Sequence, residues 1–136
     1  MEPVEFRLTT ASLESPPPVL EVRGYGALVE FLGVVRSEEK GAAIAALDYE
    51  AYDAMALKEG HRLVVEALQK HQILAIQVIH RLGRIAVGEI SIRVRVHARH
   101  RKEALAACDE FIRRMKEDVP IWKHAVSLSP SARKQG

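Results

Sequence analysis

The chain has 136 residues, a formal net charge of +2 at pH 7, 48% hydrophobic residues and 28% charged residues. This length and balance suit one globular domain with its own hydrophobic core, and the small net charge does not by itself indicate a nucleic-acid-binding protein. No apolar run approaches the roughly 20 residues that span a bilayer, and no basic N-terminal segment leads into an apolar one. We therefore expect no membrane span. The single Cys108 also excludes an intrachain disulfide, so we expect a cytoplasmic protein.

The first half of the chain predicts three strands joined by irregular segments. Residues 4–8 alternate weakly, as an edge strand does, and residues 24–35 form a largely buried strand with Gly33 as a candidate bulge. Residues 37–41 are charged and end in glycine, which is typical of a loop. Residues 44–52 predict a further strand, and we expect it to pair antiparallel with the strand at 24–35.

A helix and a strand should follow. Asp53 is a plausible N-cap for a helix that runs to about Lys70, in which Gly60 is unfavourable by about 1 kcal/mol relative to alanine. Residues 73–80 predict the next strand. In residues 90–98, apolar side chains alternate with Ser91, Arg93, Arg95 and His97, so this strand should have one core face and one wet, basic face.

The last elements are a second helix and an extended segment. The helix should begin at His100 or Arg101 and end near Lys116, because Pro120 cannot continue it. Residues 120–126 should then be extended. The order of elements predicts an α+β domain over residues 1–126, with two helices on a mostly antiparallel sheet, and a loose C-terminal tail over 127–136.

Basic side chains supply the candidate site. His100 and Arg101 lie where a strand leads into a helix, and free N–H groups there favour an anion such as phosphate; a solvated surface turn is the alternative. Lys116 ends the helix, where any cation is favoured. Lys123 follows Trp122, which either packs on the core beside a solvated lysine or holds that lysine over a pocket. No His or Cys pair has metal-ligand spacing, so no metal is expected.

Taken in order, these residues resemble the molybdopterin synthase catalytic (large) subunit family. The resemblance covers roughly residues 26–123 and is most specific at its Pro-x-Trp-Lys ending. Its segments are Gly26-Ala27, Phe31-Leu32-Gly33-Val34-Val35-Arg36, Leu47-Asp48-Tyr49-Glu50-Ala51-Tyr52 with Met55, Val78-Ile79-His80-Arg81-Leu82-Gly83, His100-Arg101, Lys116, and Val119-Pro120-Ile121-Trp122-Lys123.

The resemblance implies an α/β hammerhead-like fold with an added β subdomain. It also implies a homodimer within a heterotetramer, in which each protomer carries a small ubiquitin-like sulfur-carrier subunit. The carrier's C-terminal thiocarboxylate would convert cyclic pyranopterin monophosphate (precursor Z) into the molybdopterin dithiolene, without a cofactor. By position, Lys116 and Lys123 would be catalytic, and the substrate-binding residues would be Val34, Val35, Arg36, His100, Arg101, His124 and Ala125.

The sequence departs from the family after its last lysine. The family has a glutamate two residues further on, where this chain has Ala125, and no second tryptophan follows. Without that carboxylate, Lys123 should be freer. The departure supports an alternative hypothesis, a paralogue that binds pterin phosphate and the carrier without catalysis. A third hypothesis, nucleic-acid binding by the face of Arg93, Arg95 and Arg99, is weakened by an aromatic content of only 5%.

Overall fold

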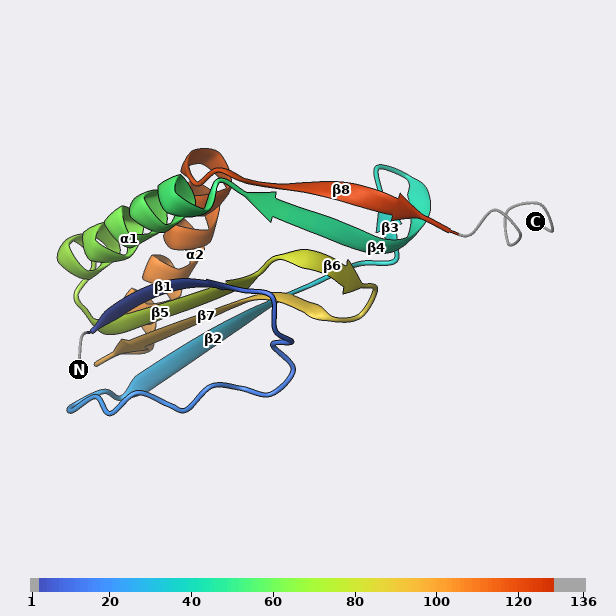
Figure 1. The fold of residues 1–136 in the computed structure, drawn as a ribbon. Coiled ribbons are helices and arrows are strands. Elements are labelled where there is room, and N and C mark those ends of the chain that lie inside the picture. Colours follow the sequence, from blue (N-terminus) through green and yellow to red (C-terminus); the bar gives the residue numbers. More distant parts are fainter. Residues whose placement is uncertain (1–2, 129–136) are drawn as a thin grey trace.

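The computed structural model describes residues 3–128 and consists of two sheets and two helices (Figure 1). The larger sheet has the strand order β1-β5-β7-β2. Only β1 and β5 run parallel; the other two pairs are antiparallel. The strands of this sheet are β1 (Val4–Thr9), β5 (Ile73–Arg81), β7 (Ile90–Ala98) and β2 (Ala27–Val34).

The smaller sheet is built around β4 and projects away from the helices (Figure 1). A separate apolar cluster of Val35, Ile44, Leu47 and Ile85 stabilises it. This sheet is the added β subdomain that the resemblance implies. Its strands are β3 (Glu38–Glu39), β4 (Ala42–Ala51), β6 (Gly83–Ala86) and β8 (Ile121–Ser127).

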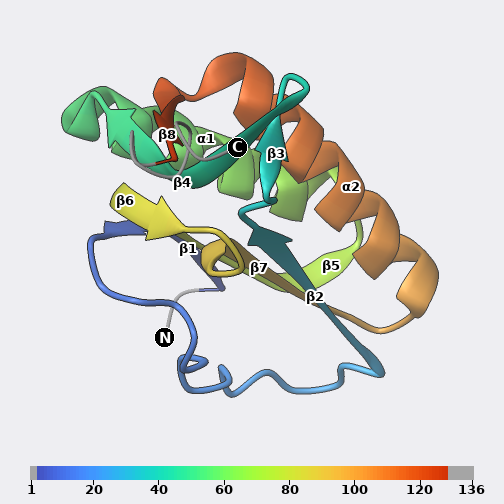
Figure 2. The same cartoon turned by 90° about the vertical axis from the view of Figure 1, so that its right-hand side faces the viewer.

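The helices α1 (Asp53–Lys70) and α2 (Arg101–Asp118) lie side by side on one face of the larger sheet (Figure 2). Their buried side chains form the main core with the apolar residues of the strands, among them Val64 and Phe111. The N-cap of α1 is Tyr52, so the prediction of Asp53 is wrong by one residue. The predicted α+β class, with two helices and a mostly antiparallel sheet, is confirmed. Neither helix of the described residues has the length and apolar character that a membrane crossing requires.

The opposite face of the larger sheet is covered by the segment between β1 and β2, residues 10–26 (Figure 2). Arg93 and Arg95 are each only 5% exposed and His97 is fully buried. Arg93 donates to the Leu13 carbonyl, and Arg95 donates to the Pro17 carbonyl and forms an ion pair with Glu30. The predicted wet, basic face is therefore wrong, and so is a nucleic-acid surface built on Arg93 and Arg95.

Strand pairing corrects two further predictions. The bulge at Gly33 is confirmed by a register shift between Gly33 and Val34, but β2 pairs with β7 and not with β4. Residues 37–41 are not simply a loop, because Glu38–Glu39 forms β3 and a tight turn at Lys40 and Gly41 joins it to β4. Of the tail expected over 127–136, Ser127 belongs to β8 and residues 129–136 lie outside the described residues. The single domain over 1–126 stays a prediction.

Gly60 has a packing role that composition alone does not indicate. A Cβ atom at this position would lie 2.3 Å from Cδ1 of Phe6, which packs β1 against α1. We expect Gly60→Ala to lower the free energy of unfolding by about 1–3 kcal/mol, because overpacking outweighs the gain in helix propensity. Urea unfolding measures this change. The double variant Phe6→Leu/Gly60→Ala should be less destabilised than the sum of its single changes, and strict additivity would contradict this contact.

Candidate functional site

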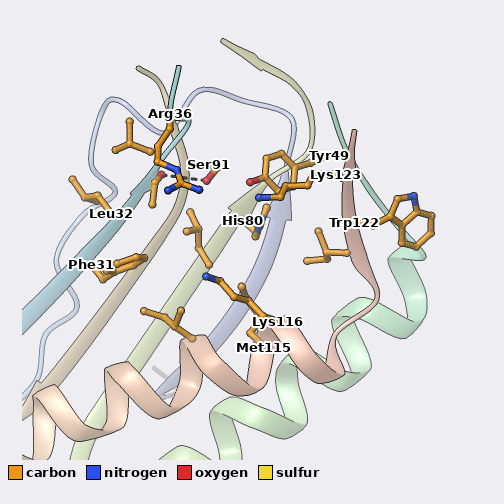
Figure 3. Close-up of a pocket in the computed structure, with 15 residues that line it drawn as sticks. Phe31, Leu32, Arg36, Tyr49, His80, Ser91, Met115, Lys116, Trp122 and Lys123 are labelled. Atoms are coloured by element: carbon orange, nitrogen blue, oxygen red, sulfur yellow. Dashed lines mark hydrogen bonds between the residues drawn. The ribbon is translucent and has the colours of Figure 1, made fainter. Parts of the chain in front are cut away.

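The candidate site is a cavity of about 650 Å³ at the junction of the two sheets and the C-terminal end of α2 (Figure 3). Most of the residues that line it are apolar, and three of the polar ones are cations, Arg36, Lys116 and Lys123. None of the described residues that line it is acidic. The remaining lining residues are Phe31, Leu32, Gly33, Val34, Tyr49, His80, Ser91, Ile92, Ile112, Met115, Ile121 and Trp122.

The three cations come from three different parts of the chain. Arg36 follows the bulged end of β2, Lys116 lies in the last turn of α2, and Lys123 lies on β8. In Figure 3 all three side chains point into the same hollow. Such an arrangement attracts an anion and can stabilise negative charge that develops during a reaction.

Strand β8 sets the direction of Lys123. Pro120 follows the end of α2, and the chain then pairs with β4 so that Lys123 lies opposite Tyr49 and Trp122 lies opposite Glu50. Trp122 packs edge-on against Tyr52 and donates from Nε1 to Glu50, which anchors the strand at the surface. Lys123 reaches the cavity, as the prediction of a lysine held over a pocket requires.

Lys123 is not free, although Ala125 supplies no carboxylate. Its Nζ lies 3.1 Å from Oε2 of Glu39 on the β3 hairpin. The Glu39 side chain is 16% exposed, so the ion pair is partly shielded from water. The expectation of a freer Lys123 is wrong, because the sequence does not reveal that the β3 hairpin brings a carboxylate to it.

Two polar residues of the cavity, Tyr49 and His80, were absent from the predicted site. They contact each other edge to face, with ring centroids 4.9 Å apart. Nδ1 of His80 lies 2.7 Å from the Arg81 carbonyl and donates to it, which leaves Nε2 as the acceptor of the neutral ring. Burial lowers the pKa of His80 to about 4, against the effect of this hydrogen bond. The sequence signal that could have indicated these two residues is a polar side chain within a predicted strand, at residues 44–52 for Tyr49 and at residues 73–80 for His80.

The neutral state of His80 makes stability dependent on pH. In the unfolded chain its pKa is near the ordinary value of 6.5, so unfolding takes up a proton below that pH. We expect this residue to contribute stability above pH 6.5 and to lose up to about 3 kcal/mol of it as the pH falls toward 4. In His80→Asn, urea unfolding should show a smaller loss between pH 7 and pH 4, whereas His61→Asn on the exposed face of α1 should match the parent chain. Equal slopes in all three proteins would contradict a buried neutral His80.

Five of the seven predicted substrate-binding residues do not line the cavity, and three of these are close in sequence to residues that do. Val35 is 2% exposed and belongs to the core of the smaller sheet, because side chains alternate and its neighbours Val34 and Arg36 take the cavity side. His124 lies 3.3 Å from Glu50 at the surface. Ala125 is exposed on β8 and does not line the cavity.

His100 and Arg101 lie at the other end of α2 from Lys116. They are exposed at the junction of β7 and α2, where His100 is the N-cap and its Nδ1 lies 3.5 Å from Glu103. Lys116 lies fifteen residues after Arg101 in α2, which corresponds to about 22 Å along the helix axis. Within one chain, these two residues therefore cannot reach an anion held by Arg36, Lys116 and Lys123.

The described residues offer little else for catalysis. In residues 3–128, no group of three or more His, Cys, Asp or Glu side chains is arranged to hold a metal ion. Cys108 is buried against the main core, and burial raises the pKa of its thiol to about 11, with a smaller effect from Asp109. A thiol of this kind is a poor nucleophile.

Comparison with known proteins identifies the family. Residues 8–118 match the MoaE protein family. The chain belongs to this family. It is 45% identical over 102 residues to a molybdopterin synthase catalytic subunit of Pyrococcus abyssi, covering 75% of this chain and 69% of the relative. The family resemblance drawn from the ordered motifs is thus confirmed.

Solved structures support the same assignment. The crystal structure of molybdopterin synthase from Staphylococcus aureus aligns with a TM-score of 0.73 and 35% identity, over 79% of this chain and 78% of that one. A complex of subunits 1 and 2 of molybdopterin-converting factor from Helicobacter pylori shares the fold, with a TM-score of 0.64 and 24% identity over 79% and 75% of the two chains. The MoaE fold therefore occurs with a second subunit in that protein.

Proposed function

We propose that this chain is the catalytic subunit of a molybdopterin synthase, and that its cationic cavity is the place of sulfur transfer. The observation that supports this most strongly is the convergence of Arg36, Lys116 and Lys123 on one cavity in a member of the MoaE family. The substrate would be precursor Z, a small pterin with a cyclic phosphate. The sulfur would come from the C-terminal thiocarboxylate of a small carrier subunit, in a cytoplasmic enzyme.

The cations match the charges of this reaction. Arg36, with its planar fork of donors, is suited to the phosphate, whose ring opens as sulfur adds. Lys116 and Lys123 would stabilise the negative charge that develops as the carrier's thiocarboxylate carbon or the pterin becomes tetrahedral, and could shuttle protons. The apolar walls at Phe31 and Met115 would hold the pterin ring.

A second copy of the chain would complete the phosphate site. The free edge of β2 exposes large apolar side chains, each 38–48% accessible: Leu28, Phe31, Leu32 and Val34. Such a contiguous apolar edge favours burial against a partner. The homodimer that the resemblance implies would cover it.

A two-fold axis across the middle of β2 would also explain His100 and Arg101. One end of β2 lies beside the start of α2, where Ala27 is opposite Ala98, and the other end leads to Arg36 in the cavity. The axis would exchange these ends, so that each cavity receives His100 and Arg101 of the other copy. Their free helix N-terminus would then add to the binding of the phosphate.

Reconstitution tests the proposed function. The chain, a thiocarboxylated carrier and precursor Z are mixed, and the dithiolene product is followed after oxidation to a fluorescent pterin. Formation of dithiolene at a rate proportional to the chain's concentration is the expected result. Binding of precursor Z without product would support the alternative, a non-catalytic paralogue, and absence of both would contradict the assignment of the cavity.

A further inference from the structure

Glu39 is the only carboxylate among the described residues that pairs with a cation of the cavity. Its Oε2 lies 3.1 Å from Nζ of Lys123, whereas Lys116 and Arg36 have no acidic partner within residues 3–128. We propose that Glu39 is a positioning residue, which holds Lys123 over the cavity from the β3 hairpin. This role rests on the proposed function, in which Lys123 acts on the substrate in the cavity.

The hairpin is built to place Glu39 at this point. Glu39 pairs with Ala42, and the two residues between them, Lys40 and Gly41, have φ angles of 52° and 81°. Two successive residues in the left-handed region form the tight two-residue turn whose twist matches that of the two flanking strands. The ion pair therefore joins β8 to the β3 hairpin, which lies in a distant part of the sequence, and both strands also pair with β4.

The contact is specific to Glu39 and not a property of an acidic loop. Its neighbour Glu38 is exposed and has no ion-pair partner among the described residues, while the Glu39 side chain is 16% exposed. A lysine has a flexible four-carbon stem, and its amine can occupy many positions unless a partner restricts it. The ion pair restricts Nζ of Lys123 to the side of the cavity that Tyr49 and His80 line.

The geometry of β8 provides a way to separate positioning from folding. Lys123 and Ala125 lie on the same face of the strand, since side chains alternate. Ala125 is exposed and makes no polar contact, so a glutamate there can be accommodated. Its carboxylate would approach Nζ of Lys123 along the strand and could replace that of Glu39.

The test compares Glu39→Gln, the matched control Glu38→Gln, and the double variant Glu39→Gln/Ala125→Glu in the reconstituted synthase. We expect Glu39→Gln to lower kcat by about tenfold with a change in KM for precursor Z of about twofold or less, because misplacement of a reacting group affects the chemical step. Glu38→Gln should match the parent chain, and Ala125→Glu should restore most of the lost kcat. An unchanged kcat in Glu39→Gln, or a loss that Ala125→Glu does not restore, would overturn the proposal.

A second measurement does not depend on activity. Acetylation of each lysine is followed by peptide mass spectrometry, with Lys116 as the internal reference. Loss of the ion pair in Glu39→Gln should raise the labelling rate of Lys123 by about threefold or more relative to Lys116, since the carboxylate shields the amine from the reagent. If the parent chain forms no product but Lys123 labelling responds in this way, the proposed function fails while the positioning contact stands. An unchanged labelling ratio would overturn the contact itself.

Discussion

Replacing Lys116 with alanine is expected to lower kcat for dithiolene formation by about a hundredfold or more, because the change removes a cation at the centre of the cavity. Lys116 enters the cavity from the last turn of α2 and has no acidic partner among the described residues, so its charge is available to the substrate. Because Lys116 is exposed on the helix, its replacement should change the free energy of unfolding by less than about 0.5 kcal/mol.

Lys102, an exposed lysine in the first turn of the same helix, provides the control. Lys102→Ala should retain the kcat of the parent chain within about twofold. Steady-state assays with excess thiocarboxylated carrier and precursor Z measure kcat for both variants. Equal activity of Lys116→Ala and Lys102→Ala would contradict a catalytic role for Lys116, provided that both variants have the same circular dichroism spectrum and unfolding midpoint.

The largest effect on stability is expected at Arg95. This side chain is 5% exposed, forms an ion pair with Glu30 and donates to the carbonyls of Pro17 and Pro18. Burial alone would raise the pKa of Glu30, but hydrogen bonds and charge from Arg95 and Arg93 lower it overall. We expect Arg95→Met to lower the free energy of unfolding by about 3 kcal/mol, because it leaves two carbonyls unpaired and Glu30 with a single partner.

Arg99, which directly follows β7, is the matched control because its side chain is exposed. Arg99→Met should change the free energy of unfolding by less than about 0.5 kcal/mol in the same urea titration. In Arg95→Met, amides of residues 10–26 should also exchange hydrogen faster, because that segment loses its anchor. A loss at Arg95 no greater than that at Arg99 would mean that this face of β7 is wet after all.

Much of the fold could be predicted from local patterns. The alternation in residues 90–98 and the apolar faces of both helices place these elements correctly, because such periodicity reflects contact with the core. The burial of Arg93, Arg95 and His97 on the other face of β7 could not be predicted, since it depends on the path of residues 10–26 across that face. The pairing of β2 with β7 was missed for a similar reason: local pattern indicates that a segment is a strand but not which strand lies beside it.

The three cationic residues of the candidate site could be predicted from the sequence. Arg36, Lys116 and Lys123 were predicted from ordered motifs, and the structure brings them together. Glu39 was not predicted, because residues 37–41 have the composition of a loop and only the hairpin with β4 directs its carboxylate to Lys123. The roles of His100 and Arg101 stay predictions, which depend on a second copy of the chain.

The most direct test of the account is the origin of sulfur in a single turnover. The chain is mixed with precursor Z and a carrier whose C-terminal thiocarboxylate is labelled with heavy sulfur, and the pterin product is examined by mass spectrometry. Two labelled sulfur atoms per product and a carrier that ends in an ordinary carboxylate are the predicted result, with both lost in Lys116→Ala. Unlabelled dithiolene, or precursor Z that stays unchanged beside intact thiocarboxylated carrier, would contradict sulfur transfer in this cavity.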